Sequence, residues 1–142
     1  MADDVLLNKA ASIERCVARA REEYAIDPKG FATNFTRQDA AILNIQRACE
    51  AALDMGQHII RRESLGLPQS ARDVFALLRQ AGWIDEVLAE SMKRMVGFRN
   101  VAVHEYQALQ LPITLNIITG HLGEFADFSQ CMLRKDASTR RS

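Results

Sequence analysis

The sequence predicts an all-α protein, an antiparallel bundle of four long helices and one short helix. Apolar residues recur at spacings of three and four along most of the 142-residue chain, which is the pattern of helices with one buried face. Residues that cap helix N-termini precede several of these runs. The alternation of apolar and polar residues that marks a half-buried strand does not occur.

The first predicted helix begins after Asp3 or Asp4, because aspartate is a favoured N-cap residue, and ends before Asp27. Its apolar stripe consists of Leu6, Ala10, Ile13, Val17, Ala20 and Tyr24. The following loop, residues 27–35, contains a turn signal and two aromatic residues. We expect this loop to pack against the helices and not to act as a domain linker.

The second predicted helix is capped by Thr36 and runs to about Glu63. Its core line consists of Ile42, Ile45, Cys49, Ala52, Gly56 and Ile59. The small residues in the middle of this line allow another backbone to come close, which predicts a central position. Ser70 caps a short third helix that stops near Gly82.

The fourth predicted helix starts at Asp85 and continues through residues 95–106. Pro112 suits the first turn of a fifth helix that runs to about Leu133 and is weakened locally by two glycines. Residues 134–142 are polar and basic, and we expect them to form a flexible tail. The chain is expected to form a single domain over residues 1–142, since its length allows one core.

Composition excludes several classes of function. Lysine plus arginine equals aspartate plus glutamate at 18 each, so the net charge gives no global attraction to nucleic acid or acidic lipid. The three cysteines are far apart in apolar patterns, which favours buried thiols over disulfides, and the histidines lack the spacing of metal ligands. No signal peptide or membrane span is evident, so we expect a cytoplasmic protein without bound metal or membrane contact.

The most informative segment places four polar residues in an apolar, helix-forming run: Arg99, Asn100, His104 and Tyr106. On a continuous helix, Asn100 and His104 share one face, while Arg99 and Tyr106 are stacked two turns apart on another. Arg99 and His104 would lie about 140° apart around the axis. They converge only if Arg99 wraps around the helix, the helix is disturbed near Gly97, or a second chain contributes. Taken without context, the arginine and histidine also fit a structural pair.

The segment Arg99-Asn100-x-x-x-His104-x-Tyr106 resembles the R-x4-H-x-Y signature of the HEPN superfamily, and specifically the HepT-type toxins that are encoded beside a minimal nucleotidyltransferase (MNT) antitoxin. The resemblance covers nearly the whole chain that is expected to be ordered. Other segments with the same pattern are Thr36-x-x-Asp39, Ile42-Leu43-Asn44-x-Gln46-Arg47, Glu50-Ala51, Pro68-Gln69-Ser70-x-Arg72-Asp73-x-Phe75 and Lys93-x-Met95-Val96-Gly97.

This resemblance implies a HEPN-like homodimer that acts as a metal-independent endoribonuclease, with the motifs of both chains in one cleft. RNA supplies its own 2′-hydroxyl nucleophile, so the protein needs a proton donor or acceptor, for which His104 is suited, and a cation near the phosphate, for which Arg99 is suited. Asn100 can orient the imidazole or a phosphate oxygen. The resemblance also implies that Tyr106 receives AMP from ATP through the MNT partner, and that the toxin itself needs no cofactor.

A second class of function stays open at this stage. The chain is alternatively a non-catalytic helical partner that binds a nucleotide or docks a nucleotidyltransferase. Fold and motif do not separate the two, because function depends on the site and not on the scaffold.

Overall fold

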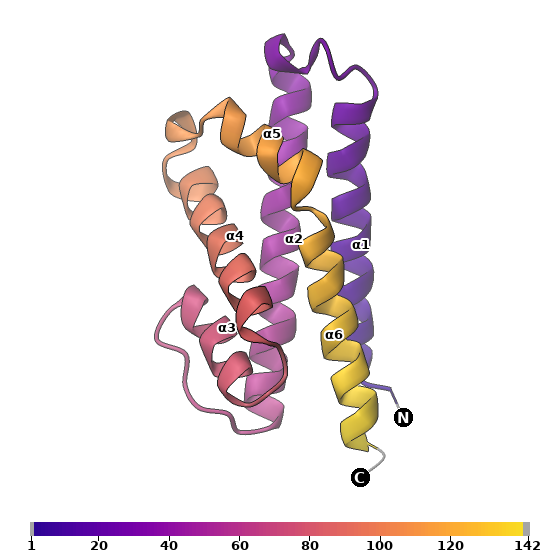
Figure 1. The fold of residues 1–142 in the computed structure, drawn as a ribbon, viewed down its shortest axis with the longest axis vertical. Helices are drawn as coiled ribbons and strands as arrows, with labels where there is room; N and C mark the ends of the chain where they lie inside the picture. Colours follow the sequence, from indigo (N-terminus) through magenta and orange to yellow (C-terminus); the bar gives the residue numbers. More distant parts are fainter. Residues whose placement is uncertain (1, 141–142) are drawn as a thin grey trace.

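The computed structural model describes residues 2–140, which form six α-helices and two 3₁₀ turns and contain no strand (Figure 1). The helices are α1 (Asp4–Ala25), α2 (Phe35–Arg62), α3 (Ala71–Gln80), α4 (Glu86–His104), α5 (Leu111–Gly120) and α6 (Gly123–Arg140). The 3₁₀ turns are η1 (Phe31–Thr33) and η2 (Tyr106–Ala108). The predicted all-α class is confirmed, with four long helices, α1, α2, α4 and α6.

Both ends of α1 are held in place. Asp3 is the N-cap of α1, because its carboxylate accepts hydrogen bonds from the amides of Val5 and Leu6. After α1, Phe31 is fully buried and packs edge-to-face on Tyr24, with ring centroids 5.4 Å apart. The loop is therefore packed down, as predicted.

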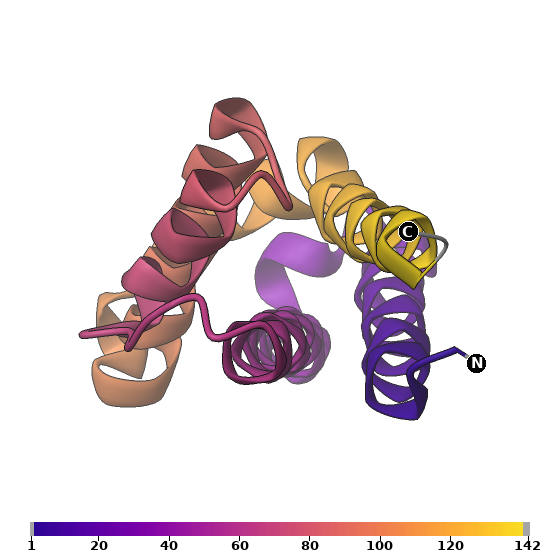
Figure 2. The same ribbon diagram turned by 90° about the horizontal axis from the view of Figure 1, so that it is seen from below.

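The central helix, α2, begins at a different cap from the predicted one. The side chain of Asn34 accepts a hydrogen bond from the amide of Arg37 at 3.1 Å, so Asn34 and not Thr36 is the N-cap. The central position of α2 is confirmed, since it lies between α1 and the α3–α4 pair when viewed along the bundle (Figure 2). A Cβ at Gly56 would lie 2.7 Å from Cγ1 of Val74, so only glycine permits α3 to approach this closely.

The third and fourth helices begin as predicted. Ser70 accepts from the amide of Asp73 at 3.2 Å, and Asp85 accepts from the amide of Leu88 at 2.8 Å. Gly82 has a φ of +78°, which suits glycine and ends α3. The sequence was sufficient to place the starts of α3 and α4, because capping depends on residues within one helical turn.

The prediction of a single fifth helix that runs to Leu133 is wrong. The chain breaks into α5 and α6 between Gly120 and Gly123, where His121 Nδ1 lies 2.5 Å from Glu124 Oε2. After α5 crosses the bundle obliquely, α6 packs alongside α1 (Figure 1). The bundle therefore has two short helices, α3 and α5, instead of one.

The expected flexible tail over residues 134–142 is also corrected, because residues 134–140 continue α6. Asp136 is 2% exposed and its Oδ1 lies 2.8 Å from Arg62 Nη2 at the end of α2. Arg62 also pairs with Asp3 at 2.9 Å, and His58 lies 2.7 Å from the same carboxylate. These charged groups fasten the end of α6 to the start of α1. Residues 141–142 of the predicted tail lie outside the described residues.

The ion pairs around Asp3 also shift its pKa. Burial opposes ionisation of Asp3, but hydrogen bonds from His58, the Leu6 amide and Arg62 outweigh it and lower the Asp3 pKa to about 2. The three cysteines are free thiols, as predicted; Cys49 is buried as expected, whereas Cys16 and Cys131 are only half-buried. None of the helices within residues 2–140 is long and apolar enough to cross a membrane.

Candidate active site at the end of helix α4

The R-x4-H segment occupies the last turns of α4, which ends at His104. Asn100 is half-buried one turn before His104, so the predicted shared face of these two residues is confirmed. The predicted stacking of Arg99 and Tyr106 is wrong, because Glu105 leaves the helical conformation with φ −143° and ψ 53°. Tyr106 therefore begins η2 and is not part of α4.

Arg99 lies on the inner side of α4, towards α2. It is half-buried, and its positive charge lies close enough to the thiol of Cys49 on α2 to interact with it. Burial raises the pKa of that thiol to about 12, although the positive charge of Arg99 opposes this shift. Among the described residues, Arg99 Nε is buried without a hydrogen-bond partner. An uncommitted buried donor of this kind is costly unless a ligand or partner satisfies it.

His104 lies on the outer side of α4 and is exposed, and no hydrogen bond to its ring is found within residues 2–140. It is about 140° from Arg99 around the helix axis, since α4 is continuous through Gly97. A disturbance near Gly97 is therefore excluded as the way to bring the two residues together. The guanidinium of Arg99 faces α2, so it does not wrap around α4 to reach His104 of the same chain.

Additional positive charge lies on the same outer side as His104. Nη2 of Arg72, from the start of α3, would be 2.9 Å from a Cβ placed on Gly97, so this guanidinium rests directly on α4. Gly97 is two turns before His104 on one face. Lys93 and Arg94 lie nearby, and each hydrogen-bonds to a side chain three residues earlier. These side chains give this part of α4 a local concentration of cations in a chain of zero net charge, although Lys93 is paired with Glu90 at 3.2 Å.

Tyr106 has a partner that sequence analysis did not predict. Its hydroxyl donates a hydrogen bond to Oδ1 of Asp39, which lies in the first turns of α2. Burial and the adjacent Asp39 carboxylate raise the Tyr106 pKa to about 12, because both disfavour the phenolate. The sequence places Asp39 in a segment with the HepT-type pattern but assigns it no partner.

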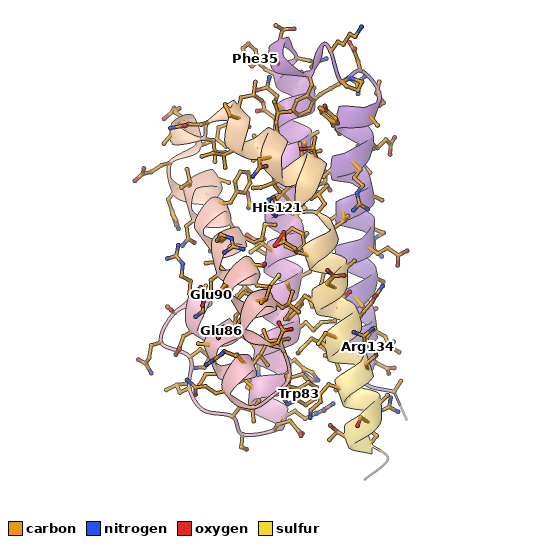
Figure 3. The ribbon with its side chains drawn as sticks, in the orientation of Figure 1. Phe35, Trp83, Glu86, Glu90, His121 and Arg134 are labelled. Carbon is orange, nitrogen blue, oxygen red and sulfur yellow. The ribbon has the colours of Figure 1, made fainter. Side chains whose placement is uncertain are left out.

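A pocket of about 320 Å³ adjoins this contact. Its lining includes Phe35, Asp39, Ile42, Tyr106, Leu109 and Thr114. Phe35 is 74% exposed and stands at the N-terminal end of α2, as Figure 3 shows. Thr114 is 1% exposed, and its hydroxyl has no hydrogen-bond partner among the described residues. The pocket thus combines an aromatic side chain, apolar walls and an unused hydrogen-bonding group.

No group of three or more histidine, cysteine, aspartate or glutamate side chains is placed to hold a metal ion anywhere in residues 2–140.

Comparison with known proteins identifies the family to which the chain belongs. A family model described as "Ribonuclease HepT-like" matches residues 13–132. The chain is 46% identical over 126 residues to the mRNA nuclease HepT of Shewanella oneidensis, covering 89% of this chain and 94% of that protein. It therefore belongs to the HepT-like ribonuclease family, and its assignment to the HepT-type toxins of the HEPN superfamily is confirmed.

Solved structures extend this agreement to the fold. A toxin–antitoxin complex with AMP-PNP matches with a TM-score of 0.88 and 44% identity, over 92% of this chain and 98% of that chain. The tri-AMPylated HEPN toxin of Shewanella oneidensis, in complex with its MNT antitoxin, matches with a TM-score of 0.87 and 45% identity, over 92% and 97% of the two chains. The fold is that of toxins from HEPN/MNT toxin–antitoxin pairs.

Proposed function

We propose that this chain is the toxin of such a pair and cleaves RNA at the end of α4 without a metal ion. The observation that carries the proposal is the arrangement of Arg99 and His104. A family-matched R-x4-H segment presents an exposed, unpartnered imidazole on one side of the helix, and a guanidinium with a buried, unused donor on the other. The unused donor of Arg99 does not benefit folding, since buried polar groups are normally paired, and the exposed imidazole of His104 is accessible to a substrate.

The chemistry follows from RNA itself, whose 2′-hydroxyl attacks the adjacent phosphorus and displaces the 5′-oxygen of the next nucleotide. His104 accepts the proton from the nucleophile or gives one to the leaving oxygen. Arg99 stabilises the negative charge that develops on the phosphate oxygens. Asn100, one turn before His104, orients the imidazole or a phosphate oxygen.

Cleavage is expected to persist when divalent ions are removed. The nucleophile and the charge stabilisation both come from organic groups, so no step requires a metal. The measurement is the cleavage rate of a labelled RNA by purified protein, with and without excess EDTA. If EDTA stopped cleavage and Mg²⁺ or Zn²⁺ restored it, the proposed mechanism would be wrong.

The active species is proposed to be a homodimer, because one chain places Arg99 and His104 on different sides of α4. Two-fold symmetry brings Arg99 of one protomer opposite His104 of its partner, and does so twice. Sedimentation should give a dimer across the concentrations at which RNA is cleaved.

Mixing two inactive variants tests the shared cleft directly. A heterodimer of Arg99→Ala and His104→Ala chains has one cleft with both groups intact and one with neither. Random mixing should therefore restore about a quarter of wild-type activity, as a statistical consequence of symmetric pairing. A mixture as inactive as its components would show that each cleft draws both groups from one chain.

We further propose that an MNT-type nucleotidyltransferase neutralises this toxin in the cytoplasm by transferring AMP from ATP to Tyr106. The related toxin of Shewanella oneidensis is AMPylated in complex with its MNT antitoxin. Tyr106 follows His104 by two residues, so an adenylate there places negative charge beside the cleft that RNA phosphates must enter.

Replacing Tyr106 with phenylalanine should preserve RNA cleavage but remove the modification. The chain has only two tyrosines, so Tyr24→Phe is the matched control and should be modified like the wild type. The measurement is intact-mass spectrometry after incubation with the partner and ATP. Added AMP masses on Tyr106→Phe, or a neutralised wild type that carries none, would contradict the proposal.

A further inference from the structure

The contact between Tyr106 and Asp39 has no role in RNA cleavage as described above. It joins η2 to the first turns of α2, two segments far apart in the chain. We propose that Asp39 is the proton acceptor for adenylyl transfer to Tyr106, and that it holds the hydroxyl ready for attack. This inference rests on the proposed modification of Tyr106 and names a residue that makes it efficient.

The geometry is that of an activated nucleophile, a hydroxyl hydrogen-bonded to a base. An ionised carboxylate is an acceptor only, so the phenol must be the donor and its lone pairs face away from Asp39. Asp39 is exposed, and no ion pair engages its carboxylate within residues 2–140. It is therefore free to take a proton and to release it to solvent.

The approach to the phenol is open. Tyr106 is 42% exposed, and the 320 Å³ pocket that it lines together with Asp39 gives room beside the hydroxyl. Asp39 and Tyr106 are the only titratable side chains lining this pocket. The exposed Phe35 provides an aromatic face at the same pocket, on which an adenine base can stack.

The transfer step balances with these groups. The Tyr106 Oη attacks the α-phosphorus of ATP bound by the nucleotidyltransferase, and an Oη–Pα bond forms. The bond between Pα and the bridging oxygen to Pβ breaks, and pyrophosphate leaves with that electron pair. The phenolic proton moves to Oδ1 of Asp39. In phosphoryl-transfer enzymes a carboxylate serves the same purpose by accepting the proton of the attacking hydroxyl.

This acceptor matters because Tyr106 does not ionise by itself near neutral pH. Its pKa is raised to about 12 by burial and by Asp39, so the phenolate is scarce in the resting protein. Proton transfer during the attack avoids that unfavourable ionisation. The carboxylate that suppresses spontaneous ionisation is thus the group that receives the proton.

The test compares Asp39→Asn with the wild type, using the partner nucleotidyltransferase at saturating concentration, with ATP and Mg²⁺. We expect the first-order rate of AMP addition at pH 7 to fall by about 10²-fold, the lower part of the range for a lost general base. Asp39→Glu should recover part of that rate. Asp54→Asn, an exposed aspartate on the same helix, is the matched control and should react like the wild type.

The pH profile separates a proton acceptor from a merely structural residue. Wild-type transfer should vary little between pH 7 and 9, because the proton moves to Asp39 during the attack and prior ionisation of the phenol is not needed. In Asp39→Asn the attacking species is the free phenolate, so the rate should rise about tenfold per pH unit as long as the pH lies below the pKa of the Tyr106 phenol. Spectrophotometric titration in a Tyr24→Phe background should show the Tyr106 pKa falling from about 12 in the same variant.

Wild-type transfer by Asp39→Asn at pH 7 would overturn the inference, as would a slow but pH-independent rate. A variant that fails to bind the partner in a pull-down would assign Asp39 to docking, which also overturns it. If the wild type itself gains no AMP on Tyr106, the proposed modification of Tyr106 is wrong, and the role of Asp39 is wrong with it. RNA cleavage by unmodified Asp39→Asn should equal that of the wild type, which keeps the two proposals separate.

Discussion

Replacing His104 with alanine is expected to lower the rate of RNA cleavage by about 10²- to 10⁴-fold, the usual contribution of a general acid–base group. The helical fold should be unchanged, because the His104 side chain is exposed and makes no hydrogen bond within the described part of the chain. The effect therefore belongs to the chemical step and not to folding.

The measurement is the single-turnover cleavage rate, with circular dichroism to verify the fold. His121→Ala is the matched control, since this imidazole lies where α5 meets α6 and pairs with Glu124 (Figure 3). It should cleave RNA like the wild type. If His104→Ala cleaved at the wild-type rate, or if both variants lost activity equally, His104 would have no special role.

Two variants of Arg99 are needed to separate the effect of its charge from the effect of its shape, because part of its side chain is buried. Arg99→Ala should lose about 10²- to 10³-fold in rate, as when one donor to a developing oxyanion is removed. Arg99→Lys keeps the positive charge but not the planar set of donors, so it should recover only part of that loss. Wild-type activity in Arg99→Lys would show that the guanidinium geometry is not used, and wild-type activity in Arg99→Ala would remove Arg99 from the mechanism.

Replacing Phe128 with alanine should have the largest effect on stability, about 3–5 kcal/mol in the free energy of unfolding. Phe128 is fully buried and packs edge-to-face on Phe75, with ring centroids 5.4 Å apart and an interplanar angle of 85°. This pair joins α6 to α3, so the variant loses both apolar burial and the packing of two helices.

Urea denaturation of the purified protein measures the change. Phe35→Ala is the matched control, because Phe35 is 74% exposed and should alter stability by less than about 0.5 kcal/mol. Equal midpoints for the two variants would show that the Phe75–Phe128 contact does not hold α6 in place. The size of the loss in the free energy of unfolding also shows how far the surrounding side chains relax into the cavity left by the Phe128 ring.

Local features were predictable wherever the deciding groups lie within a turn of one another. Ser70 and Asp85 cap their helices as expected, since each accepts from an amide three residues later. The cap of α2 was placed two residues late, because Asn34 and Thr36 both suit the position and only the extended backbone of Asn34 selects between them. The R-x4-H segment was likewise recognised from its own residues.

Long-range features were not predictable. Residues 134–140 look like a polar tail, but a 2.8 Å ion pair between Arg62 and Asp136 holds them as helix. Gly120 and Gly123 indicated that the predicted fifth helix is locally unstable. They did not indicate that the chain changes direction there so that α6 packs against α1. Such partners lie in distant segments, and periodicity contains no information about them.

The sequence by itself determined the helical class, the central position of α2, the family and the four polar residues at the end of α4. Only the tertiary structure decided that α4 ends at His104, that Arg99 faces Cys49, and that Tyr106 turns towards Asp39. The physical reason is that amphipathic periodicity and capping are local, whereas a hydrogen bond between η2 and α2 depends on how the whole bundle closes.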